Sequence, residues 1–311
     1  MHLIQVTVLT LGLVLPLFAT GEIMPPPQQV AMHSYAWIGP YGPPTRENRG
    51  FRMNLGFVTG ESAVAVIDSG YGEAMAEEML THIRRITDLP VRYVINTNSQ
   101  PHRIMGNPVF RRAGAEVITA AGVVERIATE GPAFAATVEQ VLGLDSGSVK
   151  PPQAPDRAIE AETELDLGGV RLRLLPVGDA HTRGSLVALV EPDHVVFAGD
   201  VLYGGRLLAI LPESRVRGWI QAFEQLREFG EAQFVPGHGE PGILSAFEQT
   251  THEYLTAIKR YMDQAVEEGA DLQDAIGSFD QSEWKGLADF EALAGRNAHQ
   301  AYLQSEAAAF E

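Results

Sequence analysis

Three loops of the chain carry imidazole or carboxylate side chains beside glycine, each directly after an apolar segment. His181 lies in Gly-Asp-Ala-His-Thr-Arg-Gly-Ser, Asp200 in Ala-Gly-Asp, and His238 in Pro-Gly-His-Gly. Strand ends at one edge of a sheet commonly form a crevice, so we expect these side chains to meet there. Two imidazoles and one carboxylate are a suitable ligand set for zinc or iron. A single histidine after a strand is more often a hydrogen-bonding residue, so the prediction depends on the three motifs together.

A fourth polar loop follows the apolar pair Val94-Ile95 and contains His102 and Arg103. His102 is a candidate metal ligand or general base, because imidazole can do either near neutral pH. Arg103 cannot bind a metal, since its guanidinium has no free lone pair and stays protonated. It can instead pair with Asp200. The side chains predicted to line a pocket around these groups are Asp68, Asn98, Gln100, Arg103 and Tyr203.

The elements that must position these loops are strands mixed with helices. Apolar residues at helical spacing predict helices at 73–86 and 219–229, with a short one at 109–113. Residues 120–155 are ambiguous, with a helical stretch and then a loop. Strands are expected at 56–59, 63–68, 91–95, 116–119, 164–167, 170–175, 186–190, 194–198 and 233–235. Helices on two faces of a strand core are the economical arrangement, so we predict an α/β fold.

The composition indicates a globular and acidic protein. The chain has 311 residues, of which 45% are hydrophobic and 20% charged, and its formal net charge is -17. This charge argues against nucleic acid as a partner, because a phosphate backbone is itself a polyanion. There is no cysteine, which excludes disulfides, thiolate metal sites and cysteine nucleophiles. Histidine, aspartate and glutamate remain as metal ligands.

Residues 1–21 have the features of a secretory signal peptide. Residues 3–18 are mostly apolar and uncharged, and the small residues Ala19-Thr20-Gly21 follow them. The segment before them, Met1-His2, lacks the usual basic residue, so an uncleaved anchor is the alternative. We predict cleavage, a secreted and periplasmic location, and no membrane contact afterwards. Residues 22–50 are rich in proline and glycine and predict an irregular lead-in.

The order of the motifs resembles the metallo-β-lactamase superfamily from about residue 56 to residue 242. The three glycine-flanked loops match ligand positions of that family, and Val-Ile-Asp-Ser-Gly at Asp68 matches an early turn. The resemblance implies a four-layer αβ/βα sandwich at residues 51–243. The remaining residues, 244–311, are predicted to form a C-terminal helical extension.

The family's most specific motif, His-x-His-x-Asp-His, is largely replaced in this chain. The flanking Asn-Thr and Gly-Asn pairs fix the frame without a gap. Asn98 and Gln100 then stand in place of the first two histidines, His102 in place of the aspartate and Arg103 in place of the last histidine. Amide oxygens are weak neutral donors that do not replace imidazole for zinc.

The resemblance therefore implies a reduced metal site. We expect one zinc or iron ion or none, with His102, His181, Asp200 and His238 as candidate ligands, and Arg103 as an organic cation in place of the second ion. The expected function is hydrolysis of an unknown small substrate, with His102 as ligand or base. One alternative is a metal-free pseudoenzyme that binds a ligand or a partner protein. Another is a purely structural network of hydrogen bonds.

The sequences around the motifs most resemble the periplasmic branch known as quinoprotein relay system zinc metallohydrolases. Trp284, Asn297 and the pair Ala301-Tyr302 add to this resemblance. The implied partner is a periplasmic quinoprotein of a dehydrogenase pathway.

Overall fold

Two β-sheets form the centre of the protein in the computed structural model, which describes residues 21–310. The predicted signal peptide therefore lies outside the described residues except for Gly21. The first sheet has seven strands in sequential order: β1 (Gln28–Gln29), β2 (Ser34–Trp37), β3 (Leu55–Thr59), β4 (Val64–Ile67), β5 (Val91–Asn96), β6 (Glu116–Ala120) and β7 (Arg157–Ile159). The second sheet has the order β12 (Gln233–His238), β11 (Val195–Tyr203), β10 (Ser185–Glu191), β9 (Arg171–Gly178) and β8 (Thr163–Asp166).

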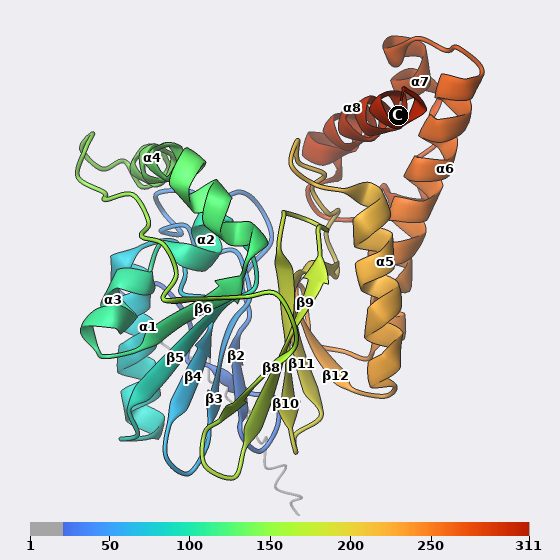
Figure 1. Cartoon of the computed structure of the whole chain (residues 1–311). Helices are drawn as coiled ribbons and strands as arrows, with labels where there is room; N and C mark the ends of the chain where they lie inside the picture. The colour runs from blue at the N-terminus through green and yellow to red at the C-terminus, as the bar shows by residue number, and fades with distance from the viewer. Residues whose placement is uncertain (1–20, 311) are drawn as a thin grey trace, which may run out of the picture.

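Helices cover the outer face of each sheet (Figure 1). The first sheet is covered by α1 (Glu73–Ile86), α3 (Asn107–Arg112) and α4 (Gly122–Leu142), and the short α2 (Pro101–Ile104) lies above the strand ends. The second sheet is covered by α5 (Val216–Leu226) with the one-turn helix Arg227–Phe229, and by α6 (Tyr254–Glu267). The predicted four-layer αβ/βα sandwich is confirmed.

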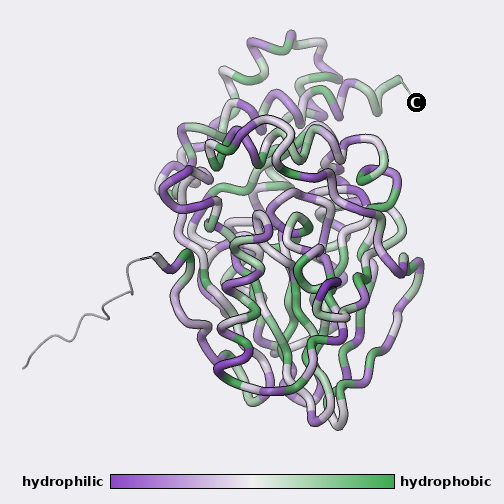
Figure 2. Tube along the Cα trace, turned by 90° about the vertical axis from the view of Figure 1, so that its left-hand side faces the viewer, coloured by the Kyte–Doolittle hydropathy of each residue, from purple (hydrophilic) through white to green (hydrophobic). Residues whose placement is uncertain are grey.

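Alternating side chains along the strands explain why both faces of each sheet are covered. In β4, Val64 and Val66 contact the core under the helices, whereas Ala65 and Ile67 contact the core between the sheets. Successive side chains of a strand point to opposite faces, so an apolar strand needs a partner layer on each side. Figure 2 shows these hydrophobic stretches along the strands. Three buried apolar clusters result, one between the two sheets and one beneath each helical layer.

Most predicted elements are present, with small shifts at their ends. The predicted helix at 73–86 has the same bounds as α1, and the expected hairpin around Gly168-Gly169 joins β8 to β9. Both glycines have positive φ, of 84° and 69°, which other residues adopt at a cost. The ambiguous segment 120–155 is mainly the 21-residue helix α4 followed by a loop.

The lead-in at 22–50 was predicted to be irregular, but it contains the two short strands β1 and β2. Strand β2 pairs antiparallel with β3, and β1 extends the same sheet. The aromatic ring of Tyr35 stacks on that of Phe57 at 4.7 Å, and Trp37 is fully buried. The sequence does not reveal β2, because the strand is short and the segment around it is rich in proline and glycine and has no alternating pattern.

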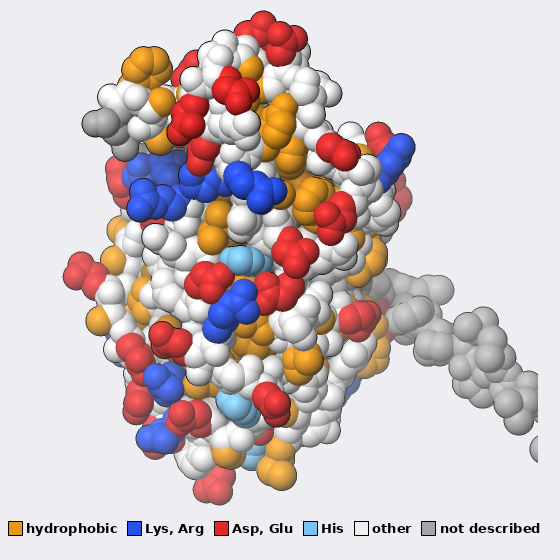
Figure 3. Space-filling view, turned by 90° about the vertical axis from the view of Figure 1, so that its right-hand side faces the viewer, with side chains coloured by type: hydrophobic (Ala, Val, Ile, Leu, Met, Phe, Trp, Pro, Cys, Tyr) orange, Lys and Arg blue, Asp and Glu red, His pale blue; other side chains and the backbone are white. Residues whose placement is uncertain are grey.

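The C-terminal residues from Leu244 onward are helical. They form the short helical turns Leu244–Phe247 and Glu248–Glu253, α6, α7 (Leu272–Ser278), Ser282–Trp284 and α8 (Phe290–Ala309). Helices α7 and α8 lie beyond the strand ends of the second sheet (Figure 1). The outer face of α5 and α6 carries side chains of both charges (Figure 3), with ion pairs such as Arg227–Glu248 and Lys259–Asp263. None of the helices between residues 21 and 310 has the length and hydrophobicity to cross a bilayer.

Candidate functional site

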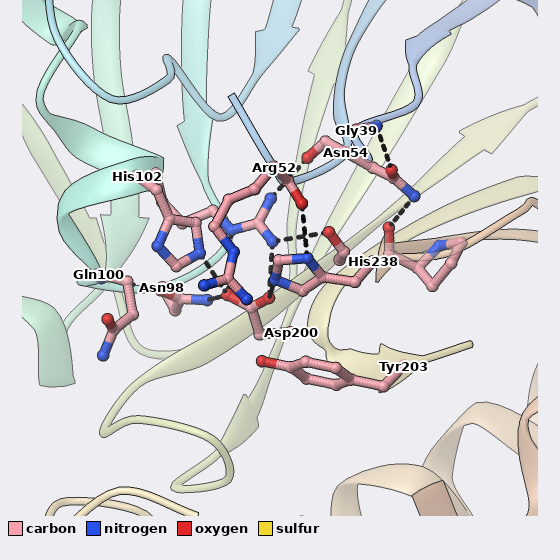
Figure 4. Close-up of polar contacts among 12 residues, drawn as sticks. Gly39, Arg52, Asn54, Asn98, Gln100, His102, Asp200, Tyr203 and His238 are labelled. Atoms are coloured by element: carbon pink, nitrogen blue, oxygen red, sulfur yellow. Dashed lines mark hydrogen bonds and ion pairs between the residues drawn. The ribbon is translucent and has the colours of Figure 1, made fainter. Parts of the chain in front are cut away.

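Four strands and one short helix bring the polar side chains to the same edge of the sandwich. Asp68 follows β4, His102 and Arg103 lie on α2 after β5, and His238 is the last residue of β12. Asp200 lies within β11, which runs on to Tyr203 instead of ending before the aspartate as the sequence suggested. Figure 4 shows the side chains from these elements pointing toward one another.

An irregularity in β11 turns Asp200 toward the site. The pairing of β11 with β12 shifts on both sides of Gly199, and Gly199 has a positive φ of 51°. A Cβ atom at this position would lie 2.2 Å from the hydroxyl of Thr97, so only glycine fits.

The guanidinium of Arg103 is completely buried between two carboxylates. Its Nε donates to Asp200 Oδ2 at 3.0 Å and its Nη2 to Asp200 Oδ1 at 2.6 Å. Its Nη1 donates to Asp68 Oδ2 at 3.1 Å and to the Asn54 carbonyl at 2.6 Å. A bidentate pair with fully used donors is the geometry in which a buried arginine is best compensated.

Asp200 is the centre of the site. Besides Arg103, its carboxylate accepts from Asn98 Nδ2 at 2.7 Å and lies 3.2 Å from His102 Nε2 and 3.4 Å from His238 Nε2. Burial alone would raise the pKa of Asp200, but the cation of Arg103 holds this pKa well below its usual range. Asp200 is therefore an anion in a water-poor environment.

The second carboxylate, Asp68, has a different environment. It accepts from the backbone and the hydroxyl of Thr97 at 2.7 and 2.8 Å. Burial raises the pKa of Asp68 to about 6, against the opposing effect of Arg103. Asp68 accepts hydrogen bonds from Arg103 and from Thr97 in the loop after β5, and it is not among the residues that line the cavity beside His102.

The imidazole of His238 faces Asp200 with its unprotonated nitrogen. His238 Nδ1 lies 2.9 Å from the carbonyl oxygen of Arg52, which can only accept, so Nδ1 carries the proton. A guanidinium nitrogen of Arg206 also approaches Nδ1, but at the longer distance of 3.4 Å. The lone pair on Nε2 then points at Asp200 Oδ1. Two acceptors at 3.4 Å can bind one metal ion between them, and a carbonyl behind a histidine is the usual support of a metal ligand.

These residues fit one metal ion. Ligand atoms of His102, Asp200 and His238 all lie within 4.8 Å of one another. Burial lowers the pKa values of His102 to about 4 and of His238 to about 3, so both imidazoles are neutral and have a free electron pair. When bound there, zinc or iron would supply a Lewis acid that lowers the pKa of water.

The residues do not fit a second ion. Asn98 donates to Asp200, and its oxygen accepts from the backbone of Gln100. The amide of Gln100 donates to Glu213 at 3.1 Å. Both side chains are thus engaged in hydrogen bonds, and the charge of Arg103 occupies the far side of Asp200. A second cation would be repelled there at close range.

His181, the fourth predicted ligand, lies outside the group formed by His102, Asp200 and His238. Its ring packs edge-on against Trp219 at 5.0 Å and beside Tyr203 at 5.9 Å. Its Nδ1 is buried without a hydrogen-bond partner among the described residues, and burial lowers its pKa to about 4. Its role as a ligand stays a prediction. The predicted pocket residue Tyr203 stacks on His238, with ring centroids 5.0 Å apart.

Two further residues shape the site although the motifs did not reveal them. Asn54 donates to the carbonyls of Pro236 and Gly239 at 2.9 and 2.7 Å, which fixes the loop carrying His238. Asn297 of α8 accepts from the backbone of Ile210 at 2.8 Å and brings α8 to the rim of the site. Asn54 lies in no motif, so only the three-dimensional contacts identify it, whereas Asn297 was noted in the sequence only for the branch resemblance and not as a site residue.

A cavity of about 250 Å³ opens beside His102, His181 and His238. Its other walls include three arginines, Arg52, Arg206 and Arg296. The C-terminal helix α8 supplies Arg296 together with Leu293 and Asn297, so the helical extension forms part of the cavity wall.

Comparisons with known proteins agree with this architecture. Residues 50–238 match the family model described as "Metallo-beta-lactamase superfamily". The acyl-coenzyme A thioesterase MBLAC2 of Bos taurus is 27% identical over 208 residues, which cover 61% of this chain and 74% of the relative. The match to MBLAC2 of Gallus gallus is 29% identical over 92 residues and spans 28% of this chain and 33% of that relative.

Solved structures share the fold at low sequence identity. A metallo-beta-lactamase from Pontibacter korlensis is similar with a TM-score of 0.60 and 20% identity, covering 74% of this chain and 98% of that one. The enzyme TMB-1 is similar with a TM-score of 0.57 and 18% identity, covering 74% and 96%. Because the family model matches more than half of the chain, the protein belongs to the metallo-β-lactamase superfamily.

Proposed function

We propose that this protein is a hydrolase whose site uses a single metal ion held by His102, Asp200 and His238. The observation that carries the proposal is the lone pair of His238 Nε2 facing Asp200 Oδ1 at 3.4 Å, with His102 close to the same carboxylate. A proton or a metal ion between these two atoms would satisfy both acceptors. The low pKa of His238, about 3, disfavours the proton and favours the metal ion.

The chain's own residues have separate roles in this proposal. Arg103 keeps Asp200 ionised and oriented through two hydrogen bonds, and it supplies the positive charge that the second ion provides in a two-metal site. His102, with 14% of its side chain exposed, is at the cavity, where it can act as a ligand or accept a proton from water. The buried wall formed by Tyr203 and Trp219 keeps bulk water from the other side.

We propose a small anionic substrate, because the cavity has an excess of arginine. Arg206 Nη2 lies 2.9 Å and Arg52 Nη2 3.7 Å from the same carboxylate oxygen of Asp289. One anion therefore faces two cations, and the Nε atoms of both arginines are buried without a hydrogen-bond partner among the described residues. A buried excess of positive charge in an acidic protein attracts an anion to this cavity.

The first substrates to test are acyl-coenzyme A thioesters, which are anionic and are named in the relatives' activity. A β-lactam carrying a carboxylate is the second class, after the names of the structural neighbours. In a β-lactam the carbonyl to be hydrolysed lies close to the carboxylate, which matches a metal ligand set beside arginines. In an acyl-coenzyme A the pantetheine arm separates the thioester from the phosphates, so only the thioester end would enter the cavity of about 250 Å³.

The test is elemental analysis of the full chain purified without chelator, together with hydrolysis assays on the two classes. About one zinc or iron per chain and measurable hydrolysis are expected. His102→Ala and His238→Ala should lower both the metal content and the rate of hydrolysis. His299→Ala, on α8, is the control and should leave both unchanged. Absence of metal after reconstitution would contradict the proposal.

One observation favours a second candidate, a metal-free pseudoenzyme that binds an anionic ligand. Arg103 already compensates Asp200, so the site can be stable without any ion. In that case the protein contains no metal, and a small anion still raises its melting temperature. Loss of this shift in Arg206→Ala would locate the ligand in the same cavity.

We also propose that the protein is exported and acts in the periplasm with a quinoprotein as its partner, as its sequence resemblance implies. The support is the sequence of residues 1–21. Intact-mass analysis of the protein from a periplasmic extract would show a chain shortened by about that segment. A full-length chain retained in the membrane fraction would favour the anchor instead.

A further inference from the structure

A second and larger cavity lies away from the candidate metal ligands, on the side of the molecule formed by α1, α3 and α4. Figure 2 views the molecule from this side. The volume of the cavity is about 890 Å³, within the usual range for pockets that bind small molecules. It is bounded by the start of α1, by α3, by the end of α4 and by the loop at residues 143–153. Tyr71 is the wall residue that it shares with the cavity at the metal ligands.

Much of the inner surface of this cavity is apolar. Met75 of α1 and Met105 line one part of it, and Val138 and Leu142 of α4 line another. Leu144 also lines it and is 47% exposed, so it extends this apolar surface to the solvent. Methionine side chains adapt to ligands of different shapes, so this surface suits a flexible hydrocarbon chain.

The rim has the opposite character, because basic side chains gather around it. Five of the chain's 23 lysines and arginines line the cavity, but only one of its 40 aspartates and glutamates does. The five are Arg46, Arg49, Arg111, Arg112 and Lys150, and the acidic residue is Glu73. A local excess of cations in a chain of net charge -17 needs a specific explanation.

Not all of these cations are engaged by the protein. Arg111 pairs with Asp156 at 3.0 Å and Arg112 with Glu73 at 2.6 Å. Within residues 21–310, neither Arg46 nor Lys150 forms an ion pair within 4.0 Å. Two cations next to an apolar chamber are therefore free to bind an anion from solution.

We infer that this cavity binds an amphiphilic anion, such as a fatty carboxylate. The apolar chain would lie against Met75, Met105 and Val138, and the charged head would lie between Arg46 and Lys150. Charge complementarity at the rim selects an anion over a neutral or cationic amphiphile. The inference does not depend on hydrolysis or on a metal ion at His102 and His238.

The experiment is isothermal titration of the full chain with dodecanoate below its micellar concentration. One molecule per chain is expected to bind, and dodecanol and dodecyltrimethylammonium should bind at least about tenfold more weakly, which corresponds to about 1.4 kcal/mol. Failure of dodecanoate to bind, or equal binding of the three amphiphiles, would overturn the inference.

Two sets of variants locate the ligand. Arg46→Ala/Lys150→Ala and Leu144→Asp should each weaken dodecanoate binding about tenfold or more. Their controls are Arg92→Ala/Lys285→Ala, which removes the same charge elsewhere, and Leu303→Asp on α8, which has a similarly exposed leucine. All the changed side chains are exposed, so folding should be preserved. Unchanged affinity in both cavity variants, or loss of binding in Arg206→Ala alone, would place the ligand elsewhere and contradict the inference.

Discussion

Arg103 and Asp200 form a fully buried bidentate ion pair, in which Nε and Nη2 of the arginine donate to the two carboxylate oxygens at 3.0 and 2.6 Å. In the family that this chain belongs to, the aligned positions carry a metal-ligating histidine and a carboxylate, according to the sequence resemblance. The resemblance thus implies that a charge of the same sign stands in place of a metal ion, held by hydrogen bonds in place of coordination bonds.

Removal of the guanidinium should destabilise the protein strongly. Arg103→Met leaves Asp200 and Asp68 buried without their common cation, and such losses cost about 3–5 kcal/mol of the free energy of unfolding. Urea unfolding followed by circular dichroism measures the change. The exposed Arg92→Met is the control and should shift the free energy of unfolding by less than about 0.5 kcal/mol. A similar small shift for Arg103→Met would mean that the pair contributes little.

Replacement of the arginine by histidine should increase metal binding. Arg103→His exchanges a permanent cation beside Asp200 for a neutral imidazole that can act as a ligand. We expect more zinc per chain than in the wild type after reconstitution, as measured by elemental analysis. Equal metal content in both proteins would remove the support for Arg103 as a substitute for the second ion.

Gly199 should tolerate no side chain. Gly199→Ala places a Cβ atom 2.2 Å from Thr97 Oγ1 at a positive φ, so we expect a loss of about 1–3 kcal/mol in the free energy of unfolding. Gly295→Ala is the matched control, because it lies inside α8 with open space around it. This control should stabilise the protein by up to about 1 kcal/mol, since alanine favours helix. Thermal unfolding of both variants distinguishes steric conflict from a general effect of alanine.

Asn297 should hold the C-terminal helix against the site. Its side chain accepts from the backbone of Ile210 and donates to the Leu208 carbonyl and the Tyr254 hydroxyl, at 2.8, 2.8 and 3.1 Å. Asn297→Ala leaves these buried groups without partners and should cost about 1–3 kcal/mol. Hydrogen exchange of the Ile210 amide should become faster, whereas Gln300→Ala on the same helix should leave it unchanged. Unaltered exchange in Asn297→Ala would show that packing alone holds α8 in place.

Much of the architecture could be predicted from local patterns in the sequence, and so could the candidate residues of the site. Apolar patterns predicted nine of the twelve described strands, all except β1, β2 and β7, and the helical spacing at residues 73–86 gave the bounds of α1. These patterns are local, because the spacing of apolar residues that indicates a strand or a helix repeats within a short stretch of sequence. The interpretation of Asn98, Gln100 and Arg103 as replaced ligands comes from the flanking pairs that fix the frame of the motif, and it stays a prediction.

Only the tertiary structure decided how these groups combine. The pairing of Arg103 with both Asp68 and Asp200 joins residues 35 and 97 positions apart, and the sharing of Asp289 by Arg52 and Arg206 joins other distant segments. Strand β2 was missed because its pattern is short and its stability comes from pairing with β3. Such contacts depend on the order of the strands in the sheets and on the packing of α8 over the site. Neither of these two features can be predicted from a local pattern of side chains.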